Sequence, residues 1–429
     1  MILLQIIPTL ISLHVARANI VQVVESKLNA ETAKSSLVNF TELFGYSPRT
    51  NLNFTELVKY DGYLSESHYV TTSDGYILAL YRIPLKDSCP QNSSKLPILF
   101  THGLYLSGDD CIIPGPGKAH CYIYADNCYD VWVPNNRGNR YSRNHTTLNP
   151  DKDAVFWNFA WDDMATKDLP AIIDYILDIT GKEQLSFIGH SQGVSNLILL
   201  CAEQPKYNTK INVGFGLSTT AWLDHSRFIG IFLEAVLSVF ADEFNNATNI
   251  EILANGGLFQ TAGNFLCGFS DVEYPFCTFL LFSVLGFNKF NIKPDVLKVL
   301  PGHVPAGTSL KDFIRWGQIR KNGFTKYDYG IKGNLVKYGE KIPPEFDLSA
   351  VSMKWVFLAS LNDFVGDPRD QKKLVNVLSN AEMCILEDKL FGHLDFLYAD
   401  SIPELITPKI LSYFETGSYK CGTDLASTI

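Results

Sequence analysis

The sequence has few charged residues and no excess of basic ones. Of its 429 residues 19% are charged, and 36 Lys and Arg stand against 45 Asp and Glu, which gives a formal net charge of −9. A protein that follows the phosphates of a nucleic acid needs a basic surface. The composition therefore argues against nucleic acid as a partner.

Repeats and low-complexity tracts are also absent. No segment recurs at a fixed period and no heptad pattern runs along the chain, which excludes solenoids and coiled coils. Hydrophobic residues make up 46% of the chain and aromatic residues 13%. This apolar content can offset the entropy of ordering, so we expect a globular protein with one large core or two smaller ones.

The N-terminal apolar segment is shorter than the roughly 20 residues that a membrane-spanning helix needs. Met1 to Ala18 ends on the small-x-small pattern Ala16-Arg17-Ala18, which is typical of a signal peptide cleaved after Ala18. No Lys or Arg precedes its apolar core, which leaves a retained core or anchor segment as the alternative. A signal peptide predicts a secreted (extracellular) or lysosomal protein with no stable transmembrane segment after cleavage.

Two further features favour the secretory route. Five Asn-x-Ser/Thr sequons are candidate glycosylation sites: Asn39, Asn53, Asn92, Asn144 and Asn246. The nine cysteines, in an oxidising compartment, leave at least one thiol unpaired within a monomer. Short bridges are expected between Cys267 and Cys277 and between two of Cys111, Cys121 and Cys128, whereas Cys201 is expected to be a buried thiol.

Short apolar runs alternate with longer helix-like segments along the chain. Four runs rich in β-branched and aromatic residues are expected to be strands: 96–101, 129–133, 185–188 and 353–358. Strands that are apolar throughout are typical of a parallel sheet buried on both faces. The sequence therefore predicts an α/β fold.

Residues from about 222 to 341 differ from their surroundings. They look helical and contain the apolar runs 229–233 and 276–285. The second run is too short to span a bilayer, so composition alone favours a buried core helix. The alternative is an inserted cap whose apolar face meets lipid.

Residues 189–193 form the pattern G-x-S-x-G around Ser191. The pattern follows an apolar run and opens a helix-compatible one, which is the setting of a nucleophile elbow. Such a turn is so tight that side chains at Gly189 and Gly193 would collide with the strand and the helix. The elbow would expose the Ser191 hydroxyl at the sheet edge, and a plain Gly/Ser surface turn is the alternative.

A serine hydroxyl becomes a strong nucleophile when a base takes its proton and a carboxylate orients that base, in the chain order Ser, Asp/Glu, His. Three histidines follow Ser191, and His393 lies in the loop after the strand-like run 383–386. Asp363 and Asp367 both follow the last of the four predicted strands. Spacing does not choose between these carboxylates, although Asp363 is nearer to the strand end and therefore better anchored.

The negative charge that develops in this chemistry needs preorganised N–H donors, usually the amide after the nucleophile and one from an early strand–helix loop. Gln192 would supply the first donor, and Leu104, which follows the strand 96–101, the second. His102 in the same loop is expected to shape the loop rather than to transfer protons.

Several segments together resemble one known family. They are 70–78 (VTTSDGYIL), 102–104 (HGL), 129–132 (YDVW) followed by 136–139 (NRGN), 168–171 (DLPA), 189–193 (GHSQG), 305–309 (PAGTS) and 393–396 (HLDF). The sequence is similar, from about residue 60 to 412, to the acid lipases, which include gastric and lysosomal acid lipases and many insect digestive lipases. Two departures from the family pattern, at 359–362 and at the extra cysteines Cys111 and Cys121, concern the substrate range and the pocket entrance.

The resemblance implies an α/β-hydrolase core with a mostly parallel sheet over 19–221 and 342–415, a helical cap and lid inserted at 222–341, and a tail at 416–429. It implies Ser191 as the nucleophile, Asp363 as the acid and His393 as the base, with Leu104 and Gln192 as oxyanion donors. It also implies a Cys267–Cys277 bridge at the edge of a mobile lid. We therefore expect residues from about 256 to 285 to cover the Ser191 pocket.

The sequence thus predicts a serine ester hydrolase: a lipase that acts on neutral lipids, triacylglycerols and also sterol esters, at a lipid–water interface, without cofactor or metal. A carboxylesterase or sterol esterase on the same scaffold is one alternative, and a non-catalytic lipid-carrying or storage protein is another. The complete set Ser191, Asp363 and His393 weighs against the non-catalytic alternative. The sequence makes no prediction of the oligomeric state.

Overall fold

The structure is a computed structural model that describes residues 47–90, 94–228, 249–257, 286, 288 and 291–421. Several expectations lie outside the described residues. They are the signal peptide at 1–18, the sequons at Asn39, Asn92 and Asn246, the apolar runs 229–233 and 276–285, the lid over 258–285, and the bridge between Cys267 and Cys277.

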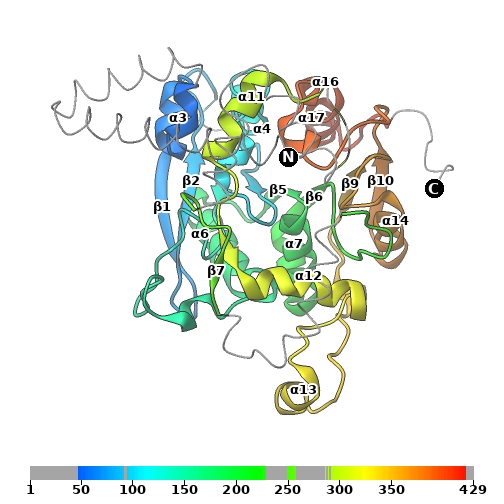
Figure 1. Ribbon diagram of the computed structural model, residues 1–429. Helices are drawn as coiled ribbons and strands as arrows, with labels where there is room; N and C mark the ends of the chain where they lie inside the picture. The colour runs from blue at the N-terminus through cyan, green and yellow to red at the C-terminus, as the bar shows by residue number, and fades with distance from the viewer. Residues whose placement is uncertain are drawn as a thin grey trace, which may run out of the picture.

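An eight-stranded sheet forms the centre of the protein (Figure 1). The strands β1 and β2 pair antiparallel, β2 also pairs antiparallel with β4, and the strands from β4 to β10 are parallel. In spatial order the strands are β1 (Glu66–Thr71), β2 (Ile77–Ile83), β4 (Val131–Pro134), β3 (Ile98–Thr101), β5 (Leu185–His190), β6 (Ile211–Leu217), β9 (Trp355–Ala359) and β10 (Ala381–Ile385). The four predicted strands are therefore confirmed as β3, β4, β5 and β9, and the strand-like run 383–386 as β10.

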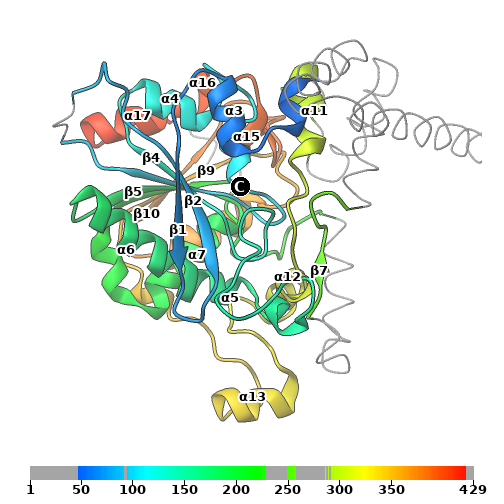
Figure 2. The same ribbon diagram turned by 90° about the vertical axis from the view of Figure 1, so that its left-hand side faces the viewer.

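Helices cover both faces of this sheet (Figure 2). One face packs against α6 (Leu169–Thr180), α7 (Gln192–Glu203) and α14 (Pro368–Val377), and the other against α3 (Phe54–Tyr60), α4 (His120–Asp126) and α17 (Thr407–Thr416). Along β3, Leu99 belongs to the first core, whereas Ile98 and Phe100 belong to the second. Both sides of each central strand are buried, which explains why the strands are apolar throughout.

The described part of the segment 222–341 contains helices and a small two-stranded sheet. It contains α11 (Pro294–Val299), α12 (Leu310–Asn322), α13 (Gly330–Tyr338) and the strand β7 (Glu251–Ile252), which pairs antiparallel with β8 (Thr308–Ser309). Within the described ranges of the chain, no helix combines the length and the apolarity needed to cross a bilayer.

Three disulfides join described cysteines: Cys89–Cys128, Cys111–Cys121 and Cys384–Cys421. The pairing of Cys111 with Cys121 resolves the choice that the sequence left open, because Cys128 bonds to Cys89 instead. Cys201 is a buried free thiol, as predicted. Burial raises the pKa of the Cys201 thiol to about 12, so this thiol stays protonated at neutral pH.

Candidate active site

Ser191 occupies a tight turn between β5 and α7, with φ 53° and ψ −123°. Glycine is required on both sides of it. A Cβ on Gly189 would lie 2.7 Å from the Phe187 ring, and a Cβ on Gly193 would lie 2.7 Å from the carbonyl oxygen of His102. The turn therefore has the geometry that the G-x-S-x-G pattern predicts, with a strained backbone held by its surroundings.

Ser191, His393 and Asp363 are joined by hydrogen bonds. The Nε2 atom of His393 lies 3.1 Å from the Ser191 hydroxyl oxygen, and Nδ1 lies 3.0 and 3.2 Å from the two carboxylate oxygens of Asp363. Asp363 follows β9 and His393 follows β10, so both side chains come from loops at the same edge of the sheet as Ser191. All three residues are buried.

Asp363 and Asp367, between which spacing alone did not choose, have different partners in the structure. Asp363 contacts His393 and also accepts backbone hydrogen bonds of 2.9 Å from Val365 and Gly366. Burial opposes ionisation of Asp363, but His393 and these hydrogen bonds hold the pKa of its carboxyl below the usual range. Asp367 instead caps α14, where it accepts the backbone amide of Arg369 at 3.0 Å.

Ser218, which the sequence analysis did not single out, lies against the same group of side chains. It follows β6 with a positive φ of 51°, and its hydroxyl forms short contacts with the Asp363 carboxylate and with Nδ1 of His393. The strand β6 was not among the predicted strands. Without that strand, nothing in the sequence places Ser218 at the sheet edge.

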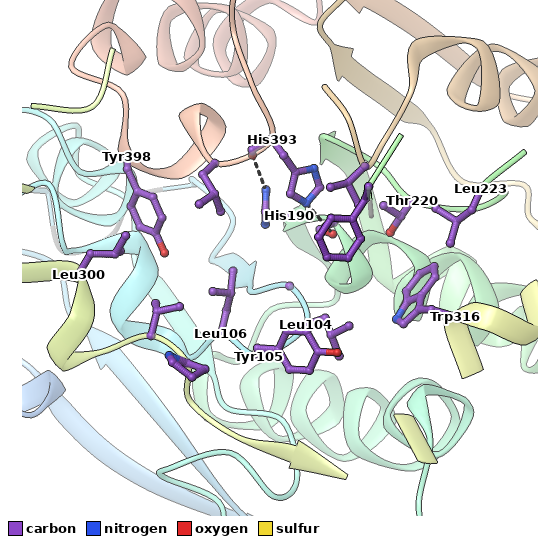
Figure 3. A pocket seen from close by; sticks show the side chains of 17 residues that line it. Leu104, Tyr105, Leu106, His190, Thr220, Leu223, Leu300, Trp316, His393 and Tyr398 are labelled. Atoms are coloured by element: carbon purple, nitrogen blue, oxygen red, sulfur yellow. Dashed lines mark hydrogen bonds between the residues drawn. The ribbon is translucent and has the colours of Figure 1, made fainter. Parts of the chain in front are cut away.

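Two other histidines lie beside this site and both are neutral. Burial, followed by the nearby His393, lowers the pKa of His190 well below its ordinary value. Because a carbonyl oxygen only accepts, the Nε2 of His190 carries the proton and donates to the carbonyl oxygen of His393 at 3.1 Å (Figure 3). Burial also lowers the pKa of His102 to about 4, and its ring contacts the carbonyl oxygen of Gly103 and the backbone amide of Asn136 at 2.8 and 3.2 Å. This agrees with the expectation that His102 shapes its loop.

A pocket with mostly apolar walls opens beside Ser191 and His393 (Figure 3). The side chains that line it include Leu104, Leu106, Leu223, Leu300, Val304 and Trp316. Leu104 lies just beyond β3, and Gln192 is the first residue of α7, so the Gln192 amide is one of the helix N–H groups without an intrahelical acceptor. Leu104 therefore lines the same pocket as Ser191, and Gln192 follows Ser191 directly in the chain.

The side chain of Gln192 is held by α12. Its Nε2 donates to the two carboxylate oxygens of Asp312 at 3.2 and 3.3 Å, and its Oε1 accepts from Nε1 of Trp316 at 2.8 Å. Asp312 also accepts the Thr308 hydroxyl at 2.9 Å. Burial raises the pKa of Asp312 to about 7, against the effect of these hydrogen bonds.

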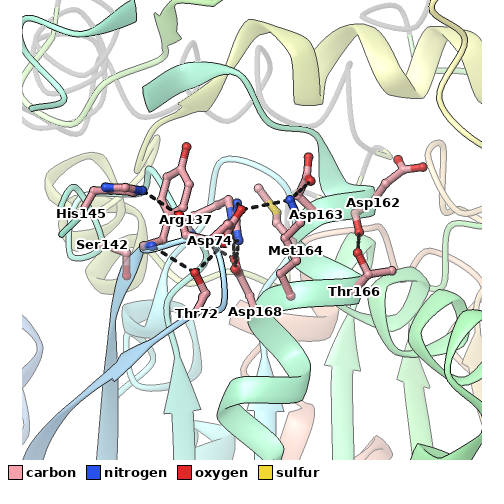
Figure 4. Close-up of polar contacts among 12 residues, drawn as sticks. Thr72, Asp74, Arg137, Ser142, His145, Asp162, Asp163, Met164, Thr166 and Asp168 are labelled. Carbon is pink, nitrogen blue, oxygen red and sulfur yellow. Dashed lines mark hydrogen bonds and ion pairs between the residues drawn. The ribbon is translucent and has the colours of Figure 1, made fainter. Parts of the chain in front are cut away.

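Three of the segments that carried the family resemblance meet away from the pocket (Figure 4). Arg137, only 1% exposed, pairs with Asp168 through Nε at 2.9 Å and with Asp74 through its two terminal nitrogens at 2.8 and 3.0 Å. Its guanidinium also lies 4.0 Å above the Tyr76 ring. The buried Arg137 and Asp168 and the partly exposed Asp74 therefore form one ion cluster, the Arg137 cluster, which joins the three segments.

A hydrogen-bonded Ser, His and Asp at the edge of a mostly parallel sheet is the arrangement of a serine ester hydrolase of the α/β-hydrolase class. Family models described as "Partial alpha/beta-hydrolase lipase region" and "alpha/beta hydrolase fold" match residues 54–114 and 97–400. "Lipase 1" of Drosophila melanogaster is 34% identical over 84% of this chain and 79% of its own length. "Gastric triacylglycerol lipase" of Rattus norvegicus is 32% identical over 87% of this chain and 94% of its own length. The chain belongs to the acid lipase family and is a lipase.

The Arg137 cluster predicts a specific loss of stability. Arg137→Leu leaves the buried carboxylate of Asp168 without its cation, which typically costs about 3–5 kcal/mol. The matched control is Lys354→Leu, which removes a partly exposed ion pair of 3.3 Å with Glu382 and should cost roughly 0–1 kcal/mol. Urea unfolding of both variants measures the difference, and equal small losses would contradict a structural role for the cluster.

Proposed function

We propose that this lipase hydrolyses carboxylic esters of neutral lipids through an acyl-enzyme. His393 takes the proton of the Ser191 hydroxyl as that oxygen attacks the ester carbonyl, and Asp363 holds the imidazole in the required tautomer. The backbone amides of Leu104 and Gln192 stabilise the oxyanion. His393 then protonates the departing alcohol, and water releases the fatty acid by the same steps. The observation that carries this proposal is the hydrogen-bonded chain Ser191–His393–Asp363.

Triacylglycerols are the proposed main substrates, with sterol esters as a second class. The apolar pocket wall suits acyl chains and offers few groups to bind a polar substrate. The rat relative, which aligns over 94% of its length, is named for triacylglycerol hydrolysis. A carboxylesterase restricted to short esters remains the alternative, and a comparison of short esters with emulsified triacylglycerols separates the two.

The proposed location is the extracellular space or the lysosome, after removal of residues 1–18. Three disulfides among the described cysteines favour an oxidising compartment. Of the two described sequons, Asn144 is exposed, whereas the Asn53 side chain accepts the amide of Glu56 and caps α3. Asn144 is therefore the better candidate for glycosylation.

We further propose the domain layout of a core, over 19–221 and 342–415, interrupted by a cap at 222–341 and followed by a tail. The strands β1 to β6 precede this insertion and β9 and β10 follow it. The described residues of the insertion contribute no strand to the eight-stranded sheet. This separation supports a core that forms around the sheet and a cap that covers its catalytic edge.

Ser191→Ala tests the proposed nucleophile. It should lower kcat by a factor on the order of 10⁶, because the acyl-enzyme no longer forms, while thermal unfolding stays close to that of the wild type. Hydrolysis of an ester substrate measures the loss. Activity within tenfold of the wild type would contradict the proposal.

The proposed acid is tested by comparing two neighbouring carboxylates. Asp363→Asn should lower kcat by a factor on the order of 10⁴, because an amide favours the wrong tautomer of His393. Asp367→Asn should cost far less, since that side chain caps α14. A reversed order of the two losses would show that the acid is misassigned.

The contact between α12 and Gln192 predicts coupled losses of activity. Gln192→Ala keeps the backbone amide but removes the side-chain contacts that hold this residue to α12. A displacement of the amide by about 1 Å can cost up to about 10² in rate. We expect Gln192→Ala, Asp312→Ala and the double variant each to lower kcat about tenfold, because all three remove one interaction. Asp312→Asn retains an acceptor and should retain most activity. Additive losses in the double variant would exclude this coupling.

A further inference from the structure

The helix α13 (Gly330–Tyr338) stands off from the body of the molecule on two extended connections (Figures 1 and 2). Four large apolar side chains are exposed on it and just after it: Ile331 (62%), Leu335 (45%), Val336 (90%) and Ile342 (71%). We name these four residues the α13 patch. Twelve large hydrophobic side chains are exposed in the described part of the chain, so one third of them lie within twelve consecutive residues.

The polarity of α13 is the reverse of that of an ordinary surface helix. Its buried residue is the polar Asn334, 1% exposed, whose amide nitrogen donates to Asp328 at 2.7 Å and to the carbonyl oxygen of Lys341 at 3.1 Å. The amide oxygen of Asn334 accepts the backbone N–H of Tyr329 at 2.8 Å. A helix that stabilises a fold turns its apolar side chains inward. Here these polar contacts, together with the Tyr338 ring packed 6.0 Å from that of Tyr329, hold the helix in place, and its aliphatic side chains face water.

The α13 patch therefore adds little to the stability of the folded chain. Exposed apolar side chains that gather in one place mark surfaces that bind something else. The charges around the patch indicate what it binds. Lys332, Lys337 and Lys341 are exposed in the segment 331–342 against a single acidic residue, Glu340, in a chain whose net charge is −9.

We propose that the α13 patch and its three lysines dock the protein on an anionic lipid surface. The apolar side chains would enter the headgroup region, while the lysines, on long flexible stems, meet the anionic headgroups. This inference rests on the proposed function, since a lipase that acts on lipid must reach a lipid surface. A second copy of the chain is a poorer occupant, because a twofold contact would place the lysines of one α13 against those of the other.

The test measures vesicle binding separately from catalysis. The full chain carrying Ser191→Ala is sedimented with vesicles of phosphatidylcholine, with or without phosphatidylglycerol, so that no hydrolysis alters the vesicles. Adding Val336→Ser and Ile342→Ser should weaken binding roughly tenfold or more, because both side chains lose their apolar burial. The matched control is Val155→Ser with Val377→Ser, which removes two exposed valines elsewhere (61% and 46%) and should leave binding unchanged.

A second pair of variants tests the role of the lysines. Lys332→Gln with Lys337→Gln should weaken binding to the vesicles that contain phosphatidylglycerol and have little effect on pure phosphatidylcholine vesicles. Equal vesicle binding by the patch variant and the valine control would overturn the proposal. So would a patch variant that converts a dimer to a monomer, by sedimentation velocity, without loss of vesicle binding, because the patch would then be a protein interface.

Enzymatic assays distinguish this inference from the proposed function. With Ser191 restored, the α13 patch variants should hydrolyse a short soluble ester like the wild type and lose activity on emulsified triacylglycerol. If the wild type hydrolyses neither substrate, the proposed function fails, whereas vesicle binding still decides the role of α13.

Discussion

The close approach of α7 to the end of β3 is the contact on which the arrangement of the site depends. A Cβ on Gly193 would meet the carbonyl oxygen of His102 at 2.7 Å, and a Cβ on Gly103 would lie 3.1 Å from Cβ of Ser191. This proximity exists only because β3 and β5 are neighbouring parallel strands. It places the loop after β3 beside the serine, and the parallel pairing of β6, β9 and β10 brings the loops of Ser218, Asp363 and His393 to the same edge.

The segment between α11 and α13 is joined to the sheet domain by buried polar contacts as well as by packing. His303 contacts Asp109 at 2.8 Å, and the Ser309 hydroxyl donates to the carbonyl oxygen of Phe159 at 2.5 Å. Asp312 and Trp316 reach Gln192 at the start of α7. Polar pairs of this kind are costly to break when buried, so this part of the proposed cap is fixed to the core. The pocket therefore has walls from both the sheet domain and the proposed cap.

Much of the fold was predictable, because strands buried on both faces are apolar throughout and the tight turn at Ser191 requires its glycines. The chain order of Ser191, Asp363 and His393 could also be predicted. Spacing alone did not choose between Asp363 and Asp367, but the family resemblance implied Asp363, and the contact of Asp363 with His393 agrees with that choice. The contacts of Ser218, Asp312 and Asn334 were not predictable. They depend on β6, on the path of α12 and on the turn around α13, and the sequence shows no local pattern for any of them. The same holds for Cys89–Cys128 and Cys384–Cys421, whose partners are 39 and 37 residues apart.

We propose that His393 and Asp363 activate Ser191 for attack on an ester. Covalent labelling with an alkyl phosphonate that resembles a fatty-acid ester, followed by peptide mass mapping, measures this activation without a choice of natural substrate. We expect a single adduct on the peptide that contains Ser191, formed rapidly by the wild type and much more slowly by the Asp363→Asn variant. An unlabelled Ser191, or an adduct on another serine that forms equally fast in both proteins, would contradict it.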